Sequence, residues 1–206
     1  MPITNSSKKG NSVIEMRKSK TSYLNLVKRK SEINQIIHKW SAIVGPAKQT
    51  SQLILHMKID IRDKKIAEFN YKVLNSILAC KSNLYKWKKT TNSNCDLCGT
   101  HQDIIHLLYS CGEINNIWQY IQGKLAIKLE MSNIIYGYNN DKDITYIISL
   151  ISYTIYKQWI VASSSNTMRQ IGTQQKLLLA DLSYRQNLLK AVKQIKLANI
   201  IHYIIS

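Results

Sequence analysis

The spacing of apolar residues predicts α-helices along most of this chain. In residues 23–44 the apolar positions recur at steps of seven, four and three around a basic run, and Gly45 and Pro46 mark the predicted helix end. From Lys64 onward a second apolar face recurs at steps of four, so both segments are predicted to be amphipathic helices. The positions are Leu26, Ile33, Ile37 and Trp40 in the first segment, and Phe69, Val73, Leu74, Ile77 and Leu78 in the second.

The second half of the chain is also predicted to be helical. A helix is expected over 114–125, weakened in its last turn by Gly123, and a long apolar helix over 144–161 with Asp143 as its N-cap. Polar residues interrupt the long helix, which favours a buried or partner-facing helix over a membrane span. A polar joint at 162–167 leads to a final helical region. The apolar positions are Ile114, Ile117, Trp118, Ile121 and Leu125 in the first helix, and Leu177, Leu178, Leu182, Leu188, Leu189, Val192, Ile195, Leu197, Ile200, Ile201 and Ile204 in the last region.

These patterns indicate a mostly α fold. The sequence has no internal repeat and no convincing β-hairpin signal, and residues 47–62 are ambiguous between strand and helix. The opening residues 1–22 are rich in Ser, Asn and Lys with few apolar side chains, and are predicted to be disordered. They contain no apolar run of the kind found in a secretory signal, so we expect an intracellular location, nuclear or cytoplasmic, and no secretion.

The net charge of +17 is concentrated in the N-terminal half. Residues 1–90 contain 19 Lys and Arg against 5 Asp and Glu, a balance of +14, whereas residues 91–206 contain 10 against 7, a balance of +3. Lysines that contact phosphates release condensed counterions, so this asymmetry predicts RNA or DNA as a partner of the basic half. Compositional drift is the alternative, because 24 of the 29 basic residues are lysine in a chain that is also rich in Ile and Asn.

Three of the four cysteines and two of the five histidines lie within CDLCGTHQDIIHLLYSC, residues 95–111. Cys95 and Cys98 are separated by two residues, which lets both chelate one ion from a tight turn. Gly99 follows directly and can take the positive φ that such a turn often needs. In an intracellular protein, cysteines at this spacing are more often metal ligands than disulfide partners.

The other two ligands come from the segment DIIHLLYS, which is predicted to form a short helix. His106 lies inside this helix and Cys111 follows it, with Gly112 as the predicted left-handed residue that ends it. Five residues of helix rise by only about 7.5 Å, so both side chains can reach one centre. Three thiolates and one imidazole form a closed Cys-Cys-His-Cys (CCHC) set, which favours one structural Zn²⁺ ion.

Other assignments of these residues stay open. His101 could replace His106 as the fourth ligand, although it lies only three residues past Cys98 in the loop. The cluster could also consist of incidental cysteines beside a core histidine. Cys80 follows Ala79 on the predicted apolar helix and is interpreted as a small buried side chain, with a redox-exposed thiol as the alternative.

Four segments are therefore expected: a disordered basic tail (1–22), a basic helical segment (23–62), a zinc-binding domain (63–125) and a C-terminal helical region (126–206). The fold class predicted for them is a helical domain that carries a small CCHC zinc-binding unit made of a loop and a helix. No membrane contact is expected. Self-association through an apolar helix is a further possibility.

Residues 68–121 resemble a known family in the order and spacing of their motifs. The pattern of Phe-x-x-Lys-x-Leu, Leu-x-x-Trp, CxxC, His-Leu, Cys and a later Trp falls on Phe69, Lys72, Leu74, Leu84, Trp87, Cys95, Cys98, His106, Leu107, Cys111 and Trp118. This run is similar to the zinc-binding domain that follows the polymerase in LINE-type (non-LTR) retrotransposon reverse transcriptases. Asp103 stands where the family often has Glu, and a weaker likeness continues through residues 132–138 and 151–160.

The resemblance implies contact with nucleic acid during target-primed reverse transcription, without polymerase activity in this chain. No YxDD-like carboxylate pair, GxGxxG, P-loop or GxSxG occurs, and the run DKD at 141–143 with distant Lys157 is a poor nuclease signature. We therefore expect a binding module and no enzyme.

Nucleic-acid contacts are expected in the basic half, with lysines at phosphates and an aromatic ring against a base. The predicted residues are Lys28, Arg29, Lys30, Lys81, Lys86, Trp87, Lys88 and Lys89, with Tyr85 as an alternative stacking ring. For Trp87 the competing interpretation is a core residue near the zinc. The alternative function is a zinc-stabilised helical scaffold whose apolar helix at 144–161 meets a protein partner or a second copy.

Overall fold

The computed structural model describes residues 34–46, 63–139, 141–165, 171–191 and 195–206. These residues form helices and two isolated β-bridges, and they contain no strand, which confirms the mostly α fold class. The predicted tail at 1–22 lies outside the described residues, as does most of the basic segment at 23–62.

The described part of the basic segment is a helix over 34–44. It ends where predicted, at Gly45, whose φ of +84° is readily adopted only by glycine. Trp40 is buried, and its indole N–H donates a hydrogen bond of 2.8 Å to the carbonyl of Leu74. The helix is thereby attached to the end of the helix that includes Leu74.

Helix α3 (Lys64–Leu74) is shorter than the apolar spacing predicts. Asp63 caps its first turn, accepting hydrogen bonds from two backbone N–H groups, and Ser76 has a left-handed φ of +56° just beyond its end. The predicted face that continues through Ile77 is therefore wrong, and the Ile77 side chain is 46% exposed. Apolar spacing continues past the residue at which the backbone reverses direction.

Two short helices, α4 (Lys81–Lys86) and α6 (Met131–Tyr136), were not expected from the sequence, because six residues are too few to show a helical period. Helix α5 (Gly112–Leu125) agrees with the prediction and includes Gly123. It ends at Ala126, which has a left-handed φ of +51°.

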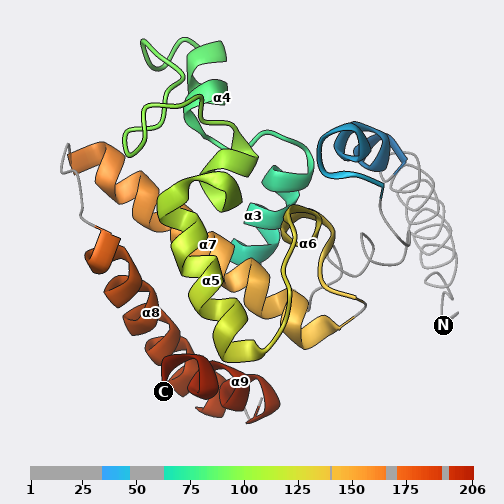
Figure 1. The fold of residues 1–206 in the computed structure, drawn as a ribbon, viewed down its shortest axis with the longest axis vertical. Helices are drawn as coiled ribbons and strands as arrows, with labels where there is room; N and C mark the ends of the chain where they lie inside the picture. The colour runs from blue at the N-terminus through green and yellow to red at the C-terminus, as the bar shows by residue number, and fades with distance from the viewer. Residues whose placement is uncertain (1–33, 47–62, 140, 166–170, 192–194) are drawn as a thin grey trace, which may run out of the picture.

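The long helix α7 (Lys142–Ser165) lies at the centre of the molecule, behind α5 in Figure 1. Its N-cap is Asp141 rather than the predicted Asp143, because the Asp141 carboxylate accepts hydrogen bonds from the N–H groups of Asp143 and Ile144. The helix also continues to Ser165, so most of the polar joint predicted at 162–167 is helical. A run of polar residues therefore does not by itself mark the end of this helix.

The core lies between α7 and the helices around it. Ile147, Leu150 and Ile151 of α7 are fully buried, and α7 packs against α3, α6 and α8. Helix α8 (Ile171–Ala191) is followed by α9 (Ile195–Ile205), which packs along it and against α5. None of the helices in the described residues is both long and apolar enough to span a lipid bilayer.

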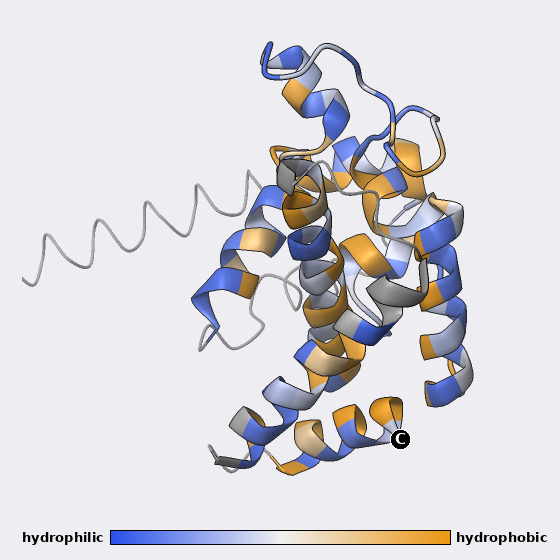
Figure 2. Cartoon of the chain, turned by 90° about the vertical axis from the view of Figure 1, so that its left-hand side faces the viewer, coloured by the Kyte–Doolittle hydropathy of each residue, from blue (hydrophilic) through white to orange (hydrophobic). Residues whose placement is uncertain are grey.

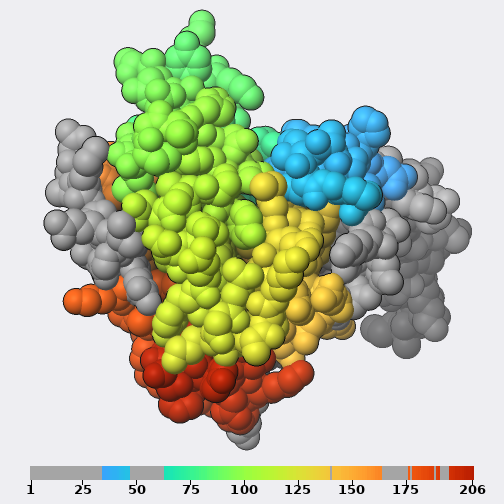
Figure 3. Space-filling view, in the orientation of Figure 1, coloured from blue at the N-terminus to red at the C-terminus, as the bar shows by residue number. Residues whose placement is uncertain are grey.

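One segment projects from this helical arrangement. Helix α4 and the loop after it extend beyond the other helices at the top of Figures 1 and 3. Figure 2 shows that this projection is mostly hydrophilic, whereas hydrophobic positions recur along the longer helices. The cysteine-rich part of the chain follows α4. It leads to η1, a single π-helical turn (His106–Ser110), which is followed by α5.

Candidate metal centre

The structure brings the four predicted ligands together. One ligand atom from each of Cys95, Cys98, His106 and Cys111 can be chosen so that all four lie within 4.8 Å of one another. Ligands held tetrahedrally about 2.0–2.3 Å from one ion lie roughly 3.3–3.8 Å apart, so small side-chain movements close this set around a metal. The four residues could therefore hold a metal ion, and thiolates with an imidazole suit zinc.

A tight turn positions the first two ligands. The Gly99 N–H donates a hydrogen bond of 2.9 Å to the carbonyl of Cys95, and the Cys95 N–H donates one of 2.7 Å to the carbonyl of Thr100. Gly99 has a φ of +74°, as predicted, and no atom crowds the place that a Cβ would occupy. Glycine is therefore favoured there by the backbone conformation and not by lack of space.

The other two ligands are placed by η1. Asp103 caps this segment, because its carboxylate accepts a hydrogen bond of 2.7 Å from the His106 N–H. The Cys111 N–H donates to the carbonyl of His106 at 3.1 Å, the five-residue hydrogen bond of a π turn. In a regular α-helix, side chains five residues apart point about 140° away from each other. The wider π turn brings the imidazole and the thiol toward the same side.

The predicted role of Gly112 is wrong. It is the first residue of α5, and it is absent from the positive-φ residues. The chain instead leaves η1 through Cys111, whose φ of −62° and ψ of 132° are extended and open to any residue. The change of direction therefore takes place at the ligand itself, between two helical segments.

The histidine in the cluster is His106 and not His101. The His106 Nε2 lies 3.2 Å from the Cys98 Sγ, while its Nδ1 lies 3.4 Å from the Thr100 hydroxyl. His101 lies outside the cluster, with its Nδ1 3.0 Å from the Ser93 hydroxyl. A ligating imidazole is normally oriented by a hydrogen bond at its other nitrogen, and Thr100 is in place to orient His106.

The thiols differ in burial and in protonation. Cys95 and Cys111 are buried, and Cys98 is exposed. A hydrogen bond from the Cys111 thiol lowers the pKa of Cys95 to about 4, against the opposing effect of burial. The same hydrogen bond, together with burial, raises the pKa of Cys111. A cation among these sulfurs would favour the thiolate form of each, because a bound metal lowers the pKa of a coordinating thiol.

The cysteine loop is attached to α4 by Gln102. This side chain is 1% exposed, and its Oε1 accepts a hydrogen bond of 3.1 Å from the Lys81 N–H. The Gln102 carbonyl accepts another, of 3.0 Å, from the Ser82 N–H. In addition, the Lys81 ammonium pairs with the Asp96 carboxylate at 2.9 Å. Lys81, a predicted phosphate contact, thus already has an anionic partner within the chain.

The remaining predicted nucleic-acid residues that the structure describes lie on the projection. Lys86, Lys88 and Lys89 are exposed, and within the described residues none of them forms an ion pair. Trp87 is 47% exposed, so the core interpretation of this residue is wrong. Lys28, Arg29 and Lys30 lie outside the described residues.

Cys80 lies apart from the cluster. It is 1% exposed, which confirms the buried interpretation, but it precedes α4 instead of lying on α3. Its Sγ is 3.3 Å from the Ser82 hydroxyl. Cys80 therefore serves as a natural control for the cysteines of the cluster.

Sequence reasoning missed the residues that support the ligands. Asp103 had a readable signal, since an acidic residue three positions before a helical histidine can cap that turn. Gln102 and Thr100 had none, because their partners lie on other segments or depend on how the loop closes.

Comparison with known proteins adds no family to this description. No protein-family model, no curated protein and no solved structure matches the chain. The similarity of residues 68–121 to the retrotransposon zinc-binding domain therefore stays a prediction from the residues themselves.

Proposed function

We propose that this chain is a zinc-containing nucleic-acid-binding module, of the kind found in the C-terminal part of non-LTR retrotransposon reverse transcriptases. Cys95, Cys98, His106 and Cys111 would hold one Zn²⁺ ion. Four protein ligands leave no open position for substrate or water, so the role assigned to the ion is structural. The ion would fix the cysteine-rich loop, which is hydrogen-bonded to the start of α4 through Gln102. The exposed basic segment, residues 85–89, lies at the other end of α4.

The observation that carries the nucleic-acid part is the exposed segment of residues 85–89, YKWKK. It combines two exposed aromatic rings with three lysines that have no ion-pair partner in the described residues. No Asp or Glu occurs between residues 69 and 95, so nothing acidic along this stretch of chain offsets the charge. Lysines beside aromatic rings match the phosphates and bases of a nucleic acid.

The scaffold alternative has less support. It assigned the apolar helix at 144–161 to a partner, but the apolar residues of α7 pack in this chain's own core. Of the large hydrophobic side chains on this helix, only Ile160 and Val161 are exposed in the described residues. A partner-facing surface of two residues is much smaller than a stable interface needs.

Metal analysis tests the zinc assignment. Purified protein should contain close to one zinc per chain, and Cys98→Ser should lower that content. Cys80→Ser is the matched control, because Cys80 is a cysteine of the same region outside the cluster. Loss of zinc in Cys80→Ser, with retention in Cys98→Ser, would contradict the ligand set.

Binding measured over a range of salt concentrations tests the nucleic-acid assignment. Affinity for RNA or DNA should fall steeply with salt, with a log–log slope of about −0.7 per phosphate neutralised on single strands. A folded, zinc-loaded protein that binds neither RNA nor DNA at low salt would contradict the proposal and favour the scaffold. Separately, a polymerase palm encoded in frame upstream would support the retrotransposon origin.

A further inference from the structure

Helix α4 ends in a left-handed residue that is not glycine. Lys88 has a φ of +58°. Its N–H donates to the carbonyl of Tyr85 at 2.9 Å, and the N–H of Lys89 donates to the carbonyl of Leu84 at 2.8 Å. This pair of hydrogen bonds is the Schellman motif, in which the left-handed position strongly favours glycine. A lysine there costs stability, because its Cβ crowds the backbone.

Helix α3 ends in the same way and supplies a comparison within the chain. Ser76 has a φ of +56°, and its N–H donates to the carbonyl of Val73 at 2.9 Å. The N–H of Ile77 donates to the carbonyl of Lys72, also at 2.9 Å. Two helix ends thus share one backbone conformation, and they differ in that only the end of α4 carries a cation at the left-handed position.

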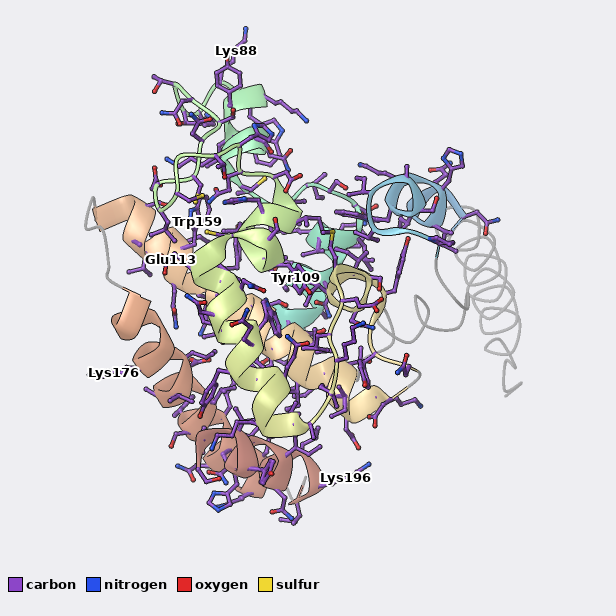
Figure 4. The ribbon with its side chains drawn as sticks, in the orientation of Figure 1. Lys88, Tyr109, Glu113, Trp159, Lys176 and Lys196 are labelled. Carbon is purple, nitrogen blue, oxygen red and sulfur yellow. The ribbon has the colours of Figure 1, made fainter. Side chains whose placement is uncertain are left out.

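The lysine stands at the end of the projection. Figure 4 shows Lys88 at the top of the molecule, with its side chain directed away from the longer helices. It is exposed and has no ion-pair partner in the described residues. Packing therefore gives no reason for a long side chain at this position.

The neighbouring residue, Trp87, differs from the tryptophans that pack in the core. Trp40 and Trp118 are 2% and 0% exposed, and each donates its indole N–H to a backbone carbonyl. Trp87 is 47% exposed and makes no ring contact within the described residues. A flat ring left open beside lysines can stack on a base, because every base has an apolar face.

We infer that residues 85–89 form a binding site for single-stranded nucleic acid, in which a base stacks on Trp87 and Lys88 contacts an adjacent phosphate. The inference rests on the proposed function and narrows it to unpaired strands. A base inside a duplex stacks on its neighbours, so its face is available to Trp87 only when the strand is unpaired. Lys88 occupies a position that would favour glycine. The inference explains this, because the charge of Lys88 contacts the ligand and does not stabilise the fold.

The test uses the full zinc-loaded chain and fluorescence anisotropy with unstructured oligouridine, oligothymidine and a duplex of equal length. Lys88→Gly should melt at the same or a higher temperature, because glycine suits the left-handed position. Its single-strand affinity should nevertheless fall about fivefold near 0.1 M salt, with the log–log slope flatter by about 0.7. Ser76→Gly is the matched control: a similar change in melting temperature and no change in affinity or slope.

Trp87→Ala tests the stacking part. Its single-strand affinity should fall about tenfold or more, with little change in duplex binding and in melting temperature. Comparing oligouridine with oligodeoxyuridine, which differ only in the sugar, would identify the preferred sugar. If Lys88→Gly should fold poorly, Lys88→Gln removes the charge while keeping a side chain at the left-handed position.

The outcomes separate the two proposals. If the unmodified protein binds but neither the Lys88 variants nor Trp87→Ala changes single-strand affinity, the site inference is overturned and the proposed function stands. Equal loss of duplex and single-strand binding in Trp87→Ala would also overturn it. If the unmodified protein binds neither strand type, the proposed function fails, and the inference fails with it.

Discussion

Two regions of this molecule are stabilised in different ways. The helical body, α5 to α9, is held by buried apolar side chains such as Trp118, Ile121 and Ile151. The cysteine segment, residues 81–103, has no such core: between Cys80 and Ile104 the only buried hydrophobic residue is Cys95. Its other buried residues are polar. They are Ser82, Asn83 and Gln102.

The difference shows that a bound metal can take the place of buried apolar surface in stabilising a segment. Burial of apolar surface contributes roughly 25 cal/mol per Å², and the cysteine segment gains little of it. Hydrogen bonds contribute only about 1 kcal/mol each, including the pair from the Asn83 side chain to the carbonyls of Ser76 and Leu78. A bound ion would add much more, because the energy of metal binding becomes local folding energy.

Metal removal should have the largest effect, and it should affect one region only. A strong chelator should abolish hydrogen-exchange protection in the cysteine segment and η1, while α7 and α9 stay protected. Structural zinc contributes on the order of 10 kcal/mol to small zinc units. Exchange in residues 81–111 that does not change on chelation would contradict a structural role for the ion.

Truncating a tryptophan should sharpen the comparison. Trp118→Ala should lower the free energy of unfolding by about 3–5 kcal/mol, because it opens a cavity and removes the 2.7 Å hydrogen bond to the Leu108 carbonyl. Trp87→Ala should change it by no more than about 0.5 kcal/mol, as for other exposed positions. Urea denaturation measures both. Equal losses would mean that Trp87 is structural after all.

A glycine of the helical body should show how tightly it is packed. Gly137 has a φ of +88°, and a Cβ there would lie 2.8 Å from the Thr145 Cγ2. Gly137→Ala should therefore cost about 2–3 kcal/mol in thermal denaturation, from backbone strain and the clash together. Gly123→Ala is the matched control: it lies within α5 with nothing nearby, and should stabilise by up to about 1 kcal/mol.

Lowering the pH should have the smallest of these effects. It should destabilise the helical body by protonating the Asp181 carboxylate. Burial acts to raise the pKa of Asp181, but hydrogen bonds from Lys157 and Thr154 and the nearby charge of Arg185 outweigh it and lower this pKa. A lowered pKa in the folded state contributes stability that is present above the unfolded value, about 4, and is lost as pH falls through the folded value.

Thermal denaturation from neutral pH to below pH 4 measures this contribution. Asp181→Asn should be less stable at neutral pH, and its stability should fall less in acid than that of the unmodified protein. The same acid dependence in both proteins would show that other carboxylates are responsible.

The three cysteines and the histidine of the candidate metal centre could be identified from the sequence because their geometry is local. Cys95 and Cys98 share one turn, and His106 and Cys111 share another, so short stretches of backbone decide which atoms can meet. The end of the helix at Gly45 and the extent of α5 were predictable for the same reason. In each case the signal and its partner lie within a few residues.

Other features could not be read from the spacing of apolar residues or from residue type alone. Apolar spacing carried the prediction of α3 past Leu74, although the left-handed Ser76 ends the helix there. Asp141 and Asp143 are both good caps, and which one is used depends on where the preceding loop brings the chain into α7. Gln102 is buried, and its Oε1 accepts a hydrogen bond from the N–H of Lys81 at the start of α4.

The sequence by itself determined that this protein is helical, basic in its N-terminal half and equipped with a compact set of three cysteines and a histidine. Periodicity, charge and ligand spacing are local properties of the chain and can be read without its fold. The apolar spacing already indicated that Trp118 is buried, but only the tertiary structure decided that Trp87 is exposed. Trp118 lies within α5 and Trp87 is the C-cap of α4, and the exposure of each depends on whether another segment covers the ring. The body covers Trp118, and within the described residues nothing covers the end of α4 as fully.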